Sequence, residues 1–433
     1  MAHVEGARLL PWLDADAGAK QSRYAEHGVV ASYNPDLAGA EKTMAFINPF
    51  VFRYEFDFWG KNRAALEAAL GDSAAEEAEF AEARLLLTTA IARSYIRGVA
   101  QAQQLALAQN MARLRRELLR LAETKFHTGL GIDDTVKQAT IELEIANKRE
   151  ASTRALVVLQ QDLLARLTGE GPDATRDLFA GKTVIIPARL SLPAHLPIEL
   201  LAHRPDLAAA MHRAEAAAER IHVAKAQFLP SIDLTTAAAG LEASVFTKNV
   251  GALPGLLFQG GAFNYAIAPG FHLPLFEGGR LRGQLAATRS QYDEAVDLYN
   301  ETLLRAAQEV ADSLNSWKET LAILEAHNRL LNSARGELNL THVRLRSGLN
   351  DRSEVLTSQH ALLDQQYGLK ALEADHLFAM VDLIQALGGG YSNGLDSPRP
   401  QLAPEEALSG LETQTPAWAL ENAASPLLPF LRN

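Results

Sequence analysis

The chain has 433 residues, of which 48% are hydrophobic and 21% are charged, and its 41 Lys and Arg against 52 Asp and Glu give a net charge of -11. This acidic balance argues against a nucleic-acid-binding surface, so no nucleic acid is expected as a partner. Because the chain has no cysteine, disulfides, thiolate metal sites and a cysteine nucleophile are excluded. No apolar run reaches the roughly 18 residues of a membrane-spanning helix.

Proline placement divides the chain. No proline occurs over residues 50–171 or over residues 275–397, and both windows are rich in Ala, Leu, Glu, Gln and Arg. Because proline breaks helix interiors and these other residues favour helix, each window is predicted to hold very long helices. Residues 172–204 are predicted to form a proline-rich connector, and residues 392–433 a proline-rich tail.

The chain repeats itself at a fixed offset. Residues 7–14 resemble residues 226–233 (226 − 7 = 219), and residues 125–130 resemble residues 344–349 at the same offset. Separated matches in one register indicate an internal duplication with a period far longer than that of a solenoid. The sequence therefore predicts a first structural repeat at 1–171 and a second at 205–391.

Each repeat is predicted to contain two strands followed by a long helix, a turn and another helix. In the first repeat we expect strands at about 11–27 and 44–59 and a helix-turn-helix at 61–168. In the second repeat we expect a helix at 206–228, strands at about 230–246 and 262–276, and a helix-turn-helix at 280–388. The counterpart of the helix at 206–228 would fall before Met1. As the chain is written, the first repeat is therefore expected to lack its first helix.

Apolar and polar residues alternate in the expected strands. The residues on the apolar face are Phe50, Phe52, Tyr54, Phe56 and Phe58 in the first repeat and Phe263, Tyr265 and Phe271 in the second. This period of two leaves two interpretations open: hairpins packed on a soluble core, or strands with apolar faces toward lipid and polar faces toward a wet lumen. Four strands are too few to close a barrel with a lumen, so strands in a membrane would need several chains to share one barrel.

Mostly apolar residues recur at alternating spacings of four and three over 107–121 and over 331–345, which predicts helices wound around one another. A solvated coiled coil without a channel would show the same spacing. Two glycine turns interrupt the helices, and each has a basic residue before it and carboxylates after it. Carboxylates in the first turn of a helix can act as simple caps, so for each of them capping and a role in a pore both stay open.

Six ordered motifs extend this pattern. They are residues 56–63, 203–207, 228–232, 273–282, 346–349 and 386–391. Together the motifs resemble the signatures of the TolC-type outer-membrane efflux channels, and most closely those of the NodT-like branch. The resemblance covers residues 7–391.

The resemblance implies a fold that is mainly α with a small β part. Long antiparallel coiled-coil helices would form an α-helical barrel across the periplasm, and three chains would each give four strands to a twelve-stranded β-barrel in outer-membrane lipid. It further implies a passive homotrimeric channel that works with a periplasmic adaptor and an inner-membrane transporter. The cargo would be drugs or other toxic small molecules, and no cofactor or enzymatic activity is expected.

The resemblance also places the two glycine turns at a periplasmic tip. The candidates for adaptor contact are Lys125, Gly129 and Leu130 in the first repeat and Arg344, Gly348 and Leu349 in the second. The candidates for the pore constriction are Glu354, Asp351, Asp133 and Asp134. Three copies of Glu354, which matches the family position at the narrowest ring, would form a cation-attracting ring.

Two features depart from this family. The first residues lack an apolar signal segment, and the lipid-bearing cysteine of the NodT-like branch is missing. Together with the missing first helix, these departures predict an N-terminally truncated member that is not exported as written. Two alternatives to a working channel therefore stay open: a soluble coiled-coil scaffold or adaptor, and a non-functional remnant of a channel.

Overall fold

A computed structural model of the chain describes residues 2–183, 203–246 and 253–391. Part of the predicted connector and the whole of the predicted tail lie outside these described residues. The chain divides into two compact units that cut across the repeats. The strand unit comprises residues 1–76 and 210–298, and the helical unit comprises residues 77–209 and 299–394.

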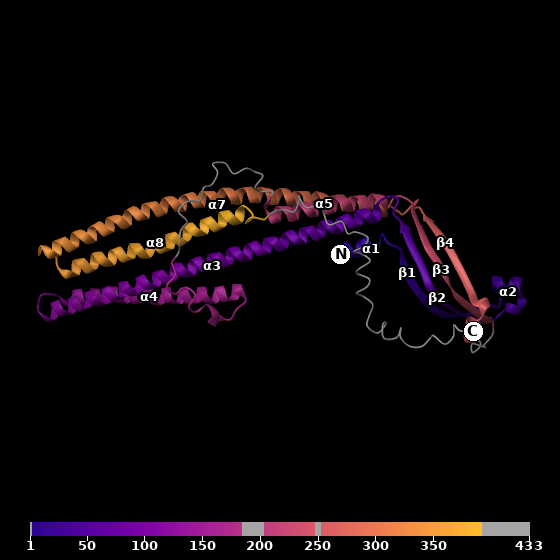
Figure 1. Ribbon diagram of the computed structural model, residues 1–433, viewed down its shortest axis with the longest axis horizontal. Helices are drawn as coiled ribbons and strands as arrows, with labels where there is room; N and C mark the ends of the chain where they lie inside the picture. Colours follow the sequence, from indigo (N-terminus) through magenta and orange to yellow (C-terminus); the bar gives the residue numbers. More distant parts are fainter. Residues whose placement is uncertain (1, 184–202, 247–252, 392–433) are drawn as a thin grey trace, which may run out of the picture. The chain divides into compact units, whose positions relative to one another are not determined.

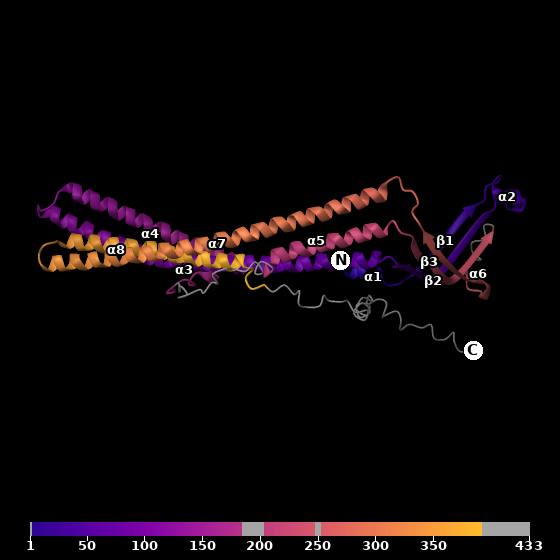
Figure 2. The same ribbon diagram turned by 90° about the horizontal axis from the view of Figure 1, so that it is seen from above.

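The long helices fall at the same offset as the sequence repeat. Helices α3 (Lys61–His127) and α7 (Arg280–Arg346) have 67 residues each, and they are followed by α4 (Asp133–Thr168) and α8 (Arg352–Ala386). Figures 1 and 2 show α4 beside α3 and α8 beside α7. Within the described ranges, no helix is both long enough and apolar enough to cross a lipid bilayer.

The remaining helical elements are shorter. The longest of them, α5, spans Pro205–Ala226, where the sequence predicted a helix at 206–228. The others are α1 (Ala2–Ala7), α2 (Val29–Tyr33), η1 (Pro35–Leu37), η2 (Pro172–Thr175), α6 (Leu253–Leu257) and η5 (Gly260–Ala262).

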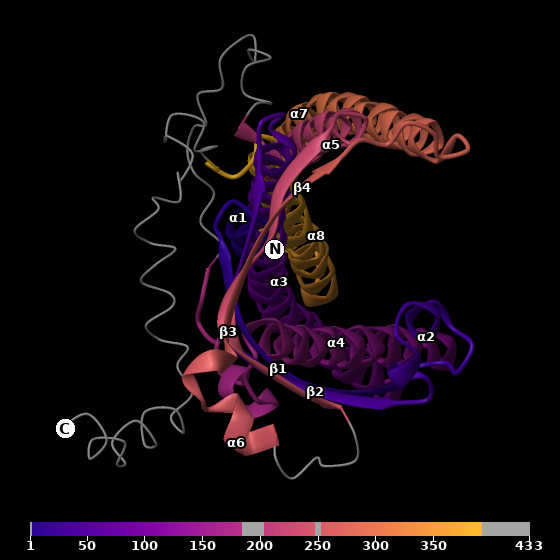
Figure 3. The same cartoon turned by 90° about the vertical axis from the view of Figure 1, so that its right-hand side faces the viewer.

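The strand unit contains one antiparallel sheet in the order β1-β2-β3-β4. Its strands are β1 (Trp12–Arg23), β2 (Glu41–Phe56), β3 (Ser231–Phe246) and β4 (Phe263–His272). Figure 3 shows the sheet as a curved ribbon that does not close on itself. Strands β1 and β4 therefore each keep one edge without a strand partner among the described residues.

The strand register brings the aromatic residues of both repeats to one face of the sheet. Pairing through β3 sets Phe50 level with Tyr265 and Phe56 level with Phe271. Because side chains alternate between faces, residues at the same level point the same way. All four of these aromatic side chains are exposed. The sheet thus has a continuous apolar face built from both repeats.

The opposite face of the sheet is polar. Arg53 of β2 lies 3.8 Å from Asp14 and 3.7 Å from Asp16 of β1, measured between guanidinium nitrogen and carboxylate oxygen. Asn264 of β4 donates a 2.8 Å hydrogen bond to Glu242 of β3. These contacts cross the sheet on the side away from the aromatic row, so the two faces differ sharply in chemistry.

Phe58 lies beyond the end of β2, although the sequence placed it in the strand. The carboxylate of Asp57 accepts hydrogen bonds from the backbone N–H groups at the start of α3, at 3.0 and 2.9 Å. Gly60, with φ of 72°, turns the chain from strand to helix there. The ring of Phe58 still stacks on Phe56, with 5.8 Å between ring centroids, so it extends the aromatic row past the strand.

Within the helical unit, the long helices follow one another around an open arc in the order α7, α8, α3, α4. Three buried clusters join neighbouring helices in this order. They are Leu324, Leu331 and Leu369 between α7 and α8, Ala100, Ala374 and Phe378 between α8 and α3, and Val99, Val157 and Leu164 between α3 and α4. Figure 3 shows α7 and α4 at the two ends of the arc.

A buried arginine ties three helices of this unit together. The guanidinium of Arg204, just before α5, donates two hydrogen bonds to Asp206 at 3.0 and 2.7 Å. It also donates to Glu309 of α7 at 2.7 Å and to the carbonyl oxygen of Ala386 at the end of α8 at 2.9 Å. Burial alone would lower the pKa of Arg204, but the hydrogen bonds to both carboxylates outweigh it and raise the pKa above its usual value.

Candidate functional site at the helical tip

The two glycine turns that join the long helices have the same backbone geometry. Gly129 and Gly348 adopt φ of 75° and 72°, a left-handed conformation that favours glycine. In each turn the leucine N–H donates to the carbonyl oxygen of the basic residue five positions earlier, at 2.8 Å in the first turn and 2.9 Å in the second. This is the hydrogen bond that commonly ends a helix at a glycine.

The leucines that follow these glycines are among the most exposed apolar side chains of the tip. Leu130 is 82% exposed and Leu349 is 76% exposed. Neighbouring Ile132, which occupies the N-cap position of α4, is exposed as well. Apolar side chains held outward by rigid turns are typical of a surface that meets a partner.

The two turns are joined by charge across the repeats. Lys125 at the end of α3 forms an ion pair with Asp351 at the start of α8. Two helical turns earlier on α3, Glu117 pairs with Arg352 of α8. In the Lys125–Asp351 pair the first repeat supplies the positive charge, and in the Glu117–Arg352 pair it supplies the negative charge.

Asp351 also caps its own helix. Its carboxylate accepts hydrogen bonds from the backbone N–H groups of Ser353 at 2.8 Å and Glu354 at 3.3 Å. The hydrogen bond from Lys125, followed by that from the Ser353 hydroxyl, lowers the pKa of Asp351 to about 2. The carboxylate is therefore ionised throughout the physiological pH range. It caps α8 and at the same time binds Lys125 of α3.

The other carboxylate candidates differ in their surroundings. Asp133 forms a local ion pair with Lys137 at 2.7 Å, one turn along α4. Asp134 and Glu354 are exposed, and neither side chain forms a hydrogen bond or ion pair with a described residue. Arg344, the counterpart of Lys125, is also exposed and has no ion-pair partner in the described part of the chain. The structure therefore brings only Asp351 together with a basic candidate.

Sequence reasoning missed the pair between Glu117 and Arg352. Both residues carry a charge near the tip, and Arg352 directly follows a chosen candidate. Nothing in the 219-residue repeat shows which helix of one repeat faces which helix of the other, because the repeat relates equivalent positions and not neighbours. Glu117 lies twelve residues before Gly129 and Arg352 only four residues after Gly348, so equal distance from the turns would not have found this pair either.

The comparisons with known proteins decide the family. The sequence profile described as outer membrane efflux protein matches residues 1–170 and 196–389. The chain belongs to this family. Its members are transport ducts, and the family assignment favours a channel over a soluble scaffold.

Two curated relatives and two solved structures support the assignment. The chain is 28% identical to the probable efflux pump outer membrane protein TtgC of Pseudomonas putida KT2440, over 90% of this chain and 77% of that protein. It is also 28% identical to outer membrane protein OprJ of Pseudomonas aeruginosa, over 90% of this chain and 78% of the relative.

Among structures, the outer membrane protein VceC of Vibrio cholerae matches with a TM-score of 0.77 and 32% identity, over 90% of each chain. The CmeC outer membrane channel of Campylobacter jejuni matches in fold, with a TM-score of 0.78 and 20% identity, over 95% of this chain and 82% of the other. The chain has the fold of a TolC-type channel. It is the outer-membrane channel of a tripartite efflux pump, located in the outer membrane and reaching into the periplasm.

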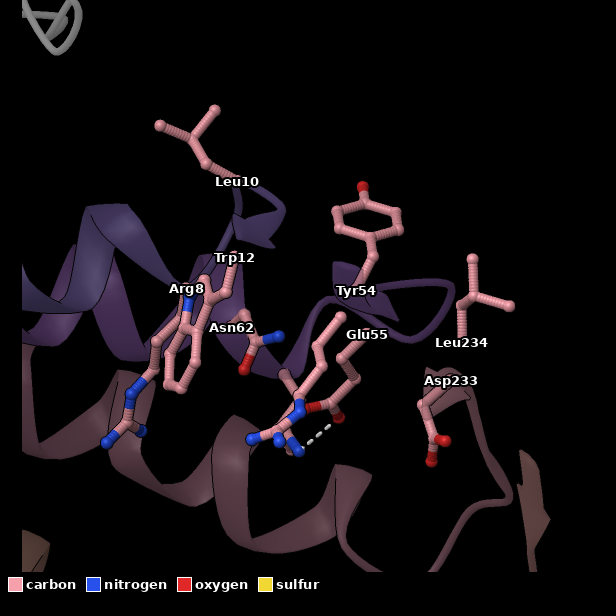
Figure 4. A pocket seen from close by; sticks show the side chains of 10 residues that line it. Arg8, Leu10, Trp12, Tyr54, Glu55, Asn62, Asp233 and Leu234 are labelled. Carbon is pink, nitrogen blue, oxygen red and sulfur yellow. Dashed lines mark hydrogen bonds and ion pairs between the residues drawn. The ribbon is translucent and has the colours of Figure 1, made fainter. Parts of the chain in front are cut away.

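A hollow lies in the strand unit, at the junction of β1, β2 and the start of α3. It is open to the surface and has a volume of about 420 Å³, and Arg8, Trp12, Tyr54 and Asn62 are among its lining residues (Figure 4). Its basic side chains face carboxylates: Lys61 pairs with Glu55, and the others have their own acidic neighbours. No group of three His, Asp or Glu side chains is placed to hold a metal ion in the described ranges.

Proposed function

We propose that three copies of the chain assemble into one passive export duct whose periplasmic end is closed at the helical tip. The observation that carries this proposal is the charge link between the two turns, Lys125 with Asp351 and Glu117 with Arg352. These ion pairs join the α3–α4 pair to the α7–α8 pair near the tip, so they restrain the position of both pairs. They do not fill the passage beside the helices. Breaking these ion pairs would let the tip widen.

The sheet supports the same assembly. Three copies would join the open edges of β1 and β4 into one closed sheet of twelve strands, which leaves no unpaired edge in lipid. The aromatic face, with Phe50, Phe56, Tyr265 and Phe271, would then lie against outer-membrane lipid, and the polar face would line the passage. Phe52, Tyr54, Phe58 and Phe263 belong to the same lipid-facing set.

The duct performs no covalent chemistry under this proposal. Energy would come from an inner-membrane transporter, coupled to the channel through a periplasmic adaptor. Relatives of the chain carry the names antibiotic efflux pump, toluene efflux pump and multidrug resistance outer membrane protein. We therefore assign drugs or other toxic small molecules as the cargo of this channel.

Glu354 is proposed as the constriction carboxylate, because it is exposed and has no partner in the described part of the chain. Three copies would concentrate cations at the tip. Changing Glu354→Gln should lower the ratio of potassium to chloride permeability severalfold in planar bilayers. Glu294→Gln, an exposed carboxylate on the strand-unit part of α7, is the matched control. An unchanged ratio in Glu354→Gln would remove this residue from the constriction.

The exposed turns are proposed as the adaptor contact. Valine in place of Gly129 or Gly348 must adopt a positive φ, at a cost of roughly 1–2 kcal/mol, and would distort the outward presentation of the leucines. We expect either variant to abolish export of a fluorescent dye from cells while the purified protein keeps its oligomeric mass. Gly171→Val is the control, since this glycine has φ of -75° and open space around it. Normal export by both tip variants would contradict an adaptor contact here.

A further inference from the structure

A β-bulge in β2 changes which face of the sheet its residues reach. Between Ile47 and Phe50 the strand uses one residue more than β3 does, and its register against β1 shifts at the same level. One extra residue reverses the alternation of side chains, so residues an even number apart across the bulge lie on opposite faces. Simple alternation would set Phe46 in the aromatic row with Phe50. The bulge sets Phe46 on the polar face instead.

The contacts of Phe46 agree with this placement. Phe46 pairs directly with Gly18 of β1 on one side and with Glu242 of β3 on the other. A Cβ added to Gly18 would lie 2.8 Å from the end of the Phe46 ring, closer than such atoms approach. The ring therefore takes the space that any other residue in place of Gly18 would fill. Glu242 accepts the 2.8 Å hydrogen bond from Asn264 that crosses the polar face.

Phe46 and Glu242 stand side by side on this face. Directly opposed residues of antiparallel strands have their Cβ atoms about 4.5–5.5 Å apart. Glu242 is exposed and forms no ion pair with a residue that the structure describes. Lys20 of β1 pairs with Met44, so it lies on the side of Phe46 away from Glu242. An aromatic face and a carboxylate both attract a positive charge, and the ring also contacts apolar surface.

We propose that Phe46 and Glu242 form a binding site for apolar organic cations inside the passage. This inference rests on the proposed assembly, in which the polar face lines the passage. The apolar part of the cation lies against the ring of Phe46, and its positive charge points toward Glu242 and away from Lys20. Three copies of the chain present the same pair at one level of the duct.

The site selects cargo by charge without holding it. Cation–π contacts and ion pairs are weak where the groups are exposed, and Glu242 is exposed. A duct needs this weakness, because a molecule that binds strongly in a passage does not leave it. The passage would thus favour organic cations over organic anions, in addition to any selection by the transporter.

The absence of cysteine allows a reporter next to the site. Met44→Cys stands two residues from Phe46 on the same face. We would label it in liposomes with a sulfonated maleimide, which does not cross lipid, and add ethidium, a planar aromatic cation. Ethidium at about twice its dissociation constant should slow the labelling about threefold, because the unoccupied fraction falls with [L]/Kd. Fluorescein, an aromatic anion, should not slow it.

Two further changes in the Met44→Cys chain test the two groups separately. Phe46→Leu keeps an apolar side chain and removes the aromatic face, and Glu242→Gln keeps the shape and removes the charge. Each should raise the ethidium concentration needed for the same slowing by about three- to fivefold. Phe50→Leu and Glu41→Gln are the matched controls on the other face of β2 and should leave that concentration unchanged.

The possible failures separate the site from the duct. No slowing by ethidium, or an equal loss of slowing in Phe46→Leu and Phe50→Leu, overturns the binding site. A single Phe50→Cys should stay unlabelled in liposomes, because its thiol faces lipid in the proposed assembly. Labelling of Phe50→Cys as fast as that of Met44→Cys would mean that the polar face does not line a passage, and it would overturn the duct together with the site.

Discussion

Replacing Lys125 by methionine is expected to raise the open fraction of the channel by about 10- to 100-fold. Both partners of the Lys125–Asp351 pair are more than one-third exposed, so one such link is worth roughly 0.5–1 kcal/mol. Three copies that open together would add to about 1.5–3 kcal/mol, and each 1.4 kcal/mol changes a population tenfold. Methionine keeps the length of the side chain and removes only the charge.

Single-channel recording in planar bilayers measures this change. Lys137→Met serves as the control, because it breaks an ion pair within α4, with Asp133, and leaves the link between the repeats intact. Lys125→Arg keeps the charge and should retain most of the closure. Equal open fractions for Lys125→Met and Lys137→Met would show that the charge link does not hold the tip closed.

The pH dependence of closure follows from Asp351. Its pKa is lowered from 3.8 to about 2, mainly by the hydrogen bond from Lys125. A carboxyl group with a depressed pKa contributes its stabilisation above the ordinary pKa and loses it as the pH falls toward the lowered value. Closure of the unmodified channel should therefore be constant between pH 7 and about 5. Opening within that interval would require a different titrating group.

The sequence predicted where helices end and which strand face is apolar better than it predicted which residues of the two repeats meet. Gly129 and Gly348 mark the ends of α3 and α7 because a left-handed residue terminates a helix wherever the surrounding packing occurs. The alternation from Phe50 to Phe56 likewise identifies the apolar face of β2, because faces alternate along any strand. Local rules of this kind depend only on neighbouring residues, so they can be read without the structure.

Contacts between the repeats could not be predicted in the same way. Lys125 and Asp351 were both chosen as candidates, but for different roles, and nothing in the sequence showed that they meet. Their meeting depends on the packing of α8 against α3 through small residues such as Ala100 and Ala374. Alanine is common throughout these helices, so its presence alone does not indicate which face is buried.

The Arg204 contacts are also out of reach of local rules, and they carry the largest expected effect on stability. The Arg204 side chain is 8% exposed and binds Asp206, Glu309 and a carbonyl oxygen of α8. Leucine in its place would leave Asp206, whose side chain is only 14% exposed, without its counter-charge. Because Glu309 is half exposed, we expect a loss of about 2–4 kcal/mol, somewhat below the cost of breaking a fully buried pair. The stability of Arg204→Lys should fall between that of the unmodified protein and that of Arg204→Leu. Lysine keeps the charge but cannot bind Asp206 through two parallel hydrogen bonds.

Thermal loss of helical circular dichroism in detergent measures this effect. Arg154→Leu on the exposed surface of α4 is the control, and its stability is expected to stay within about 0.5 kcal/mol of that of the unmodified protein.

The pH dependence of the stability loss gives a sharper test through Glu82. Its pKa is raised, first by burial and then by Asp206, while Arg204 lowers it, so removing Arg204 should raise it further. A carboxyl group with a raised pKa favours the folded state as the pH falls, because the folded form binds the proton more tightly. Arg204→Leu should therefore lose more stability at pH 8 than at pH 5, and an equal loss at both would mean that the carboxylates around Arg204 do not cause it.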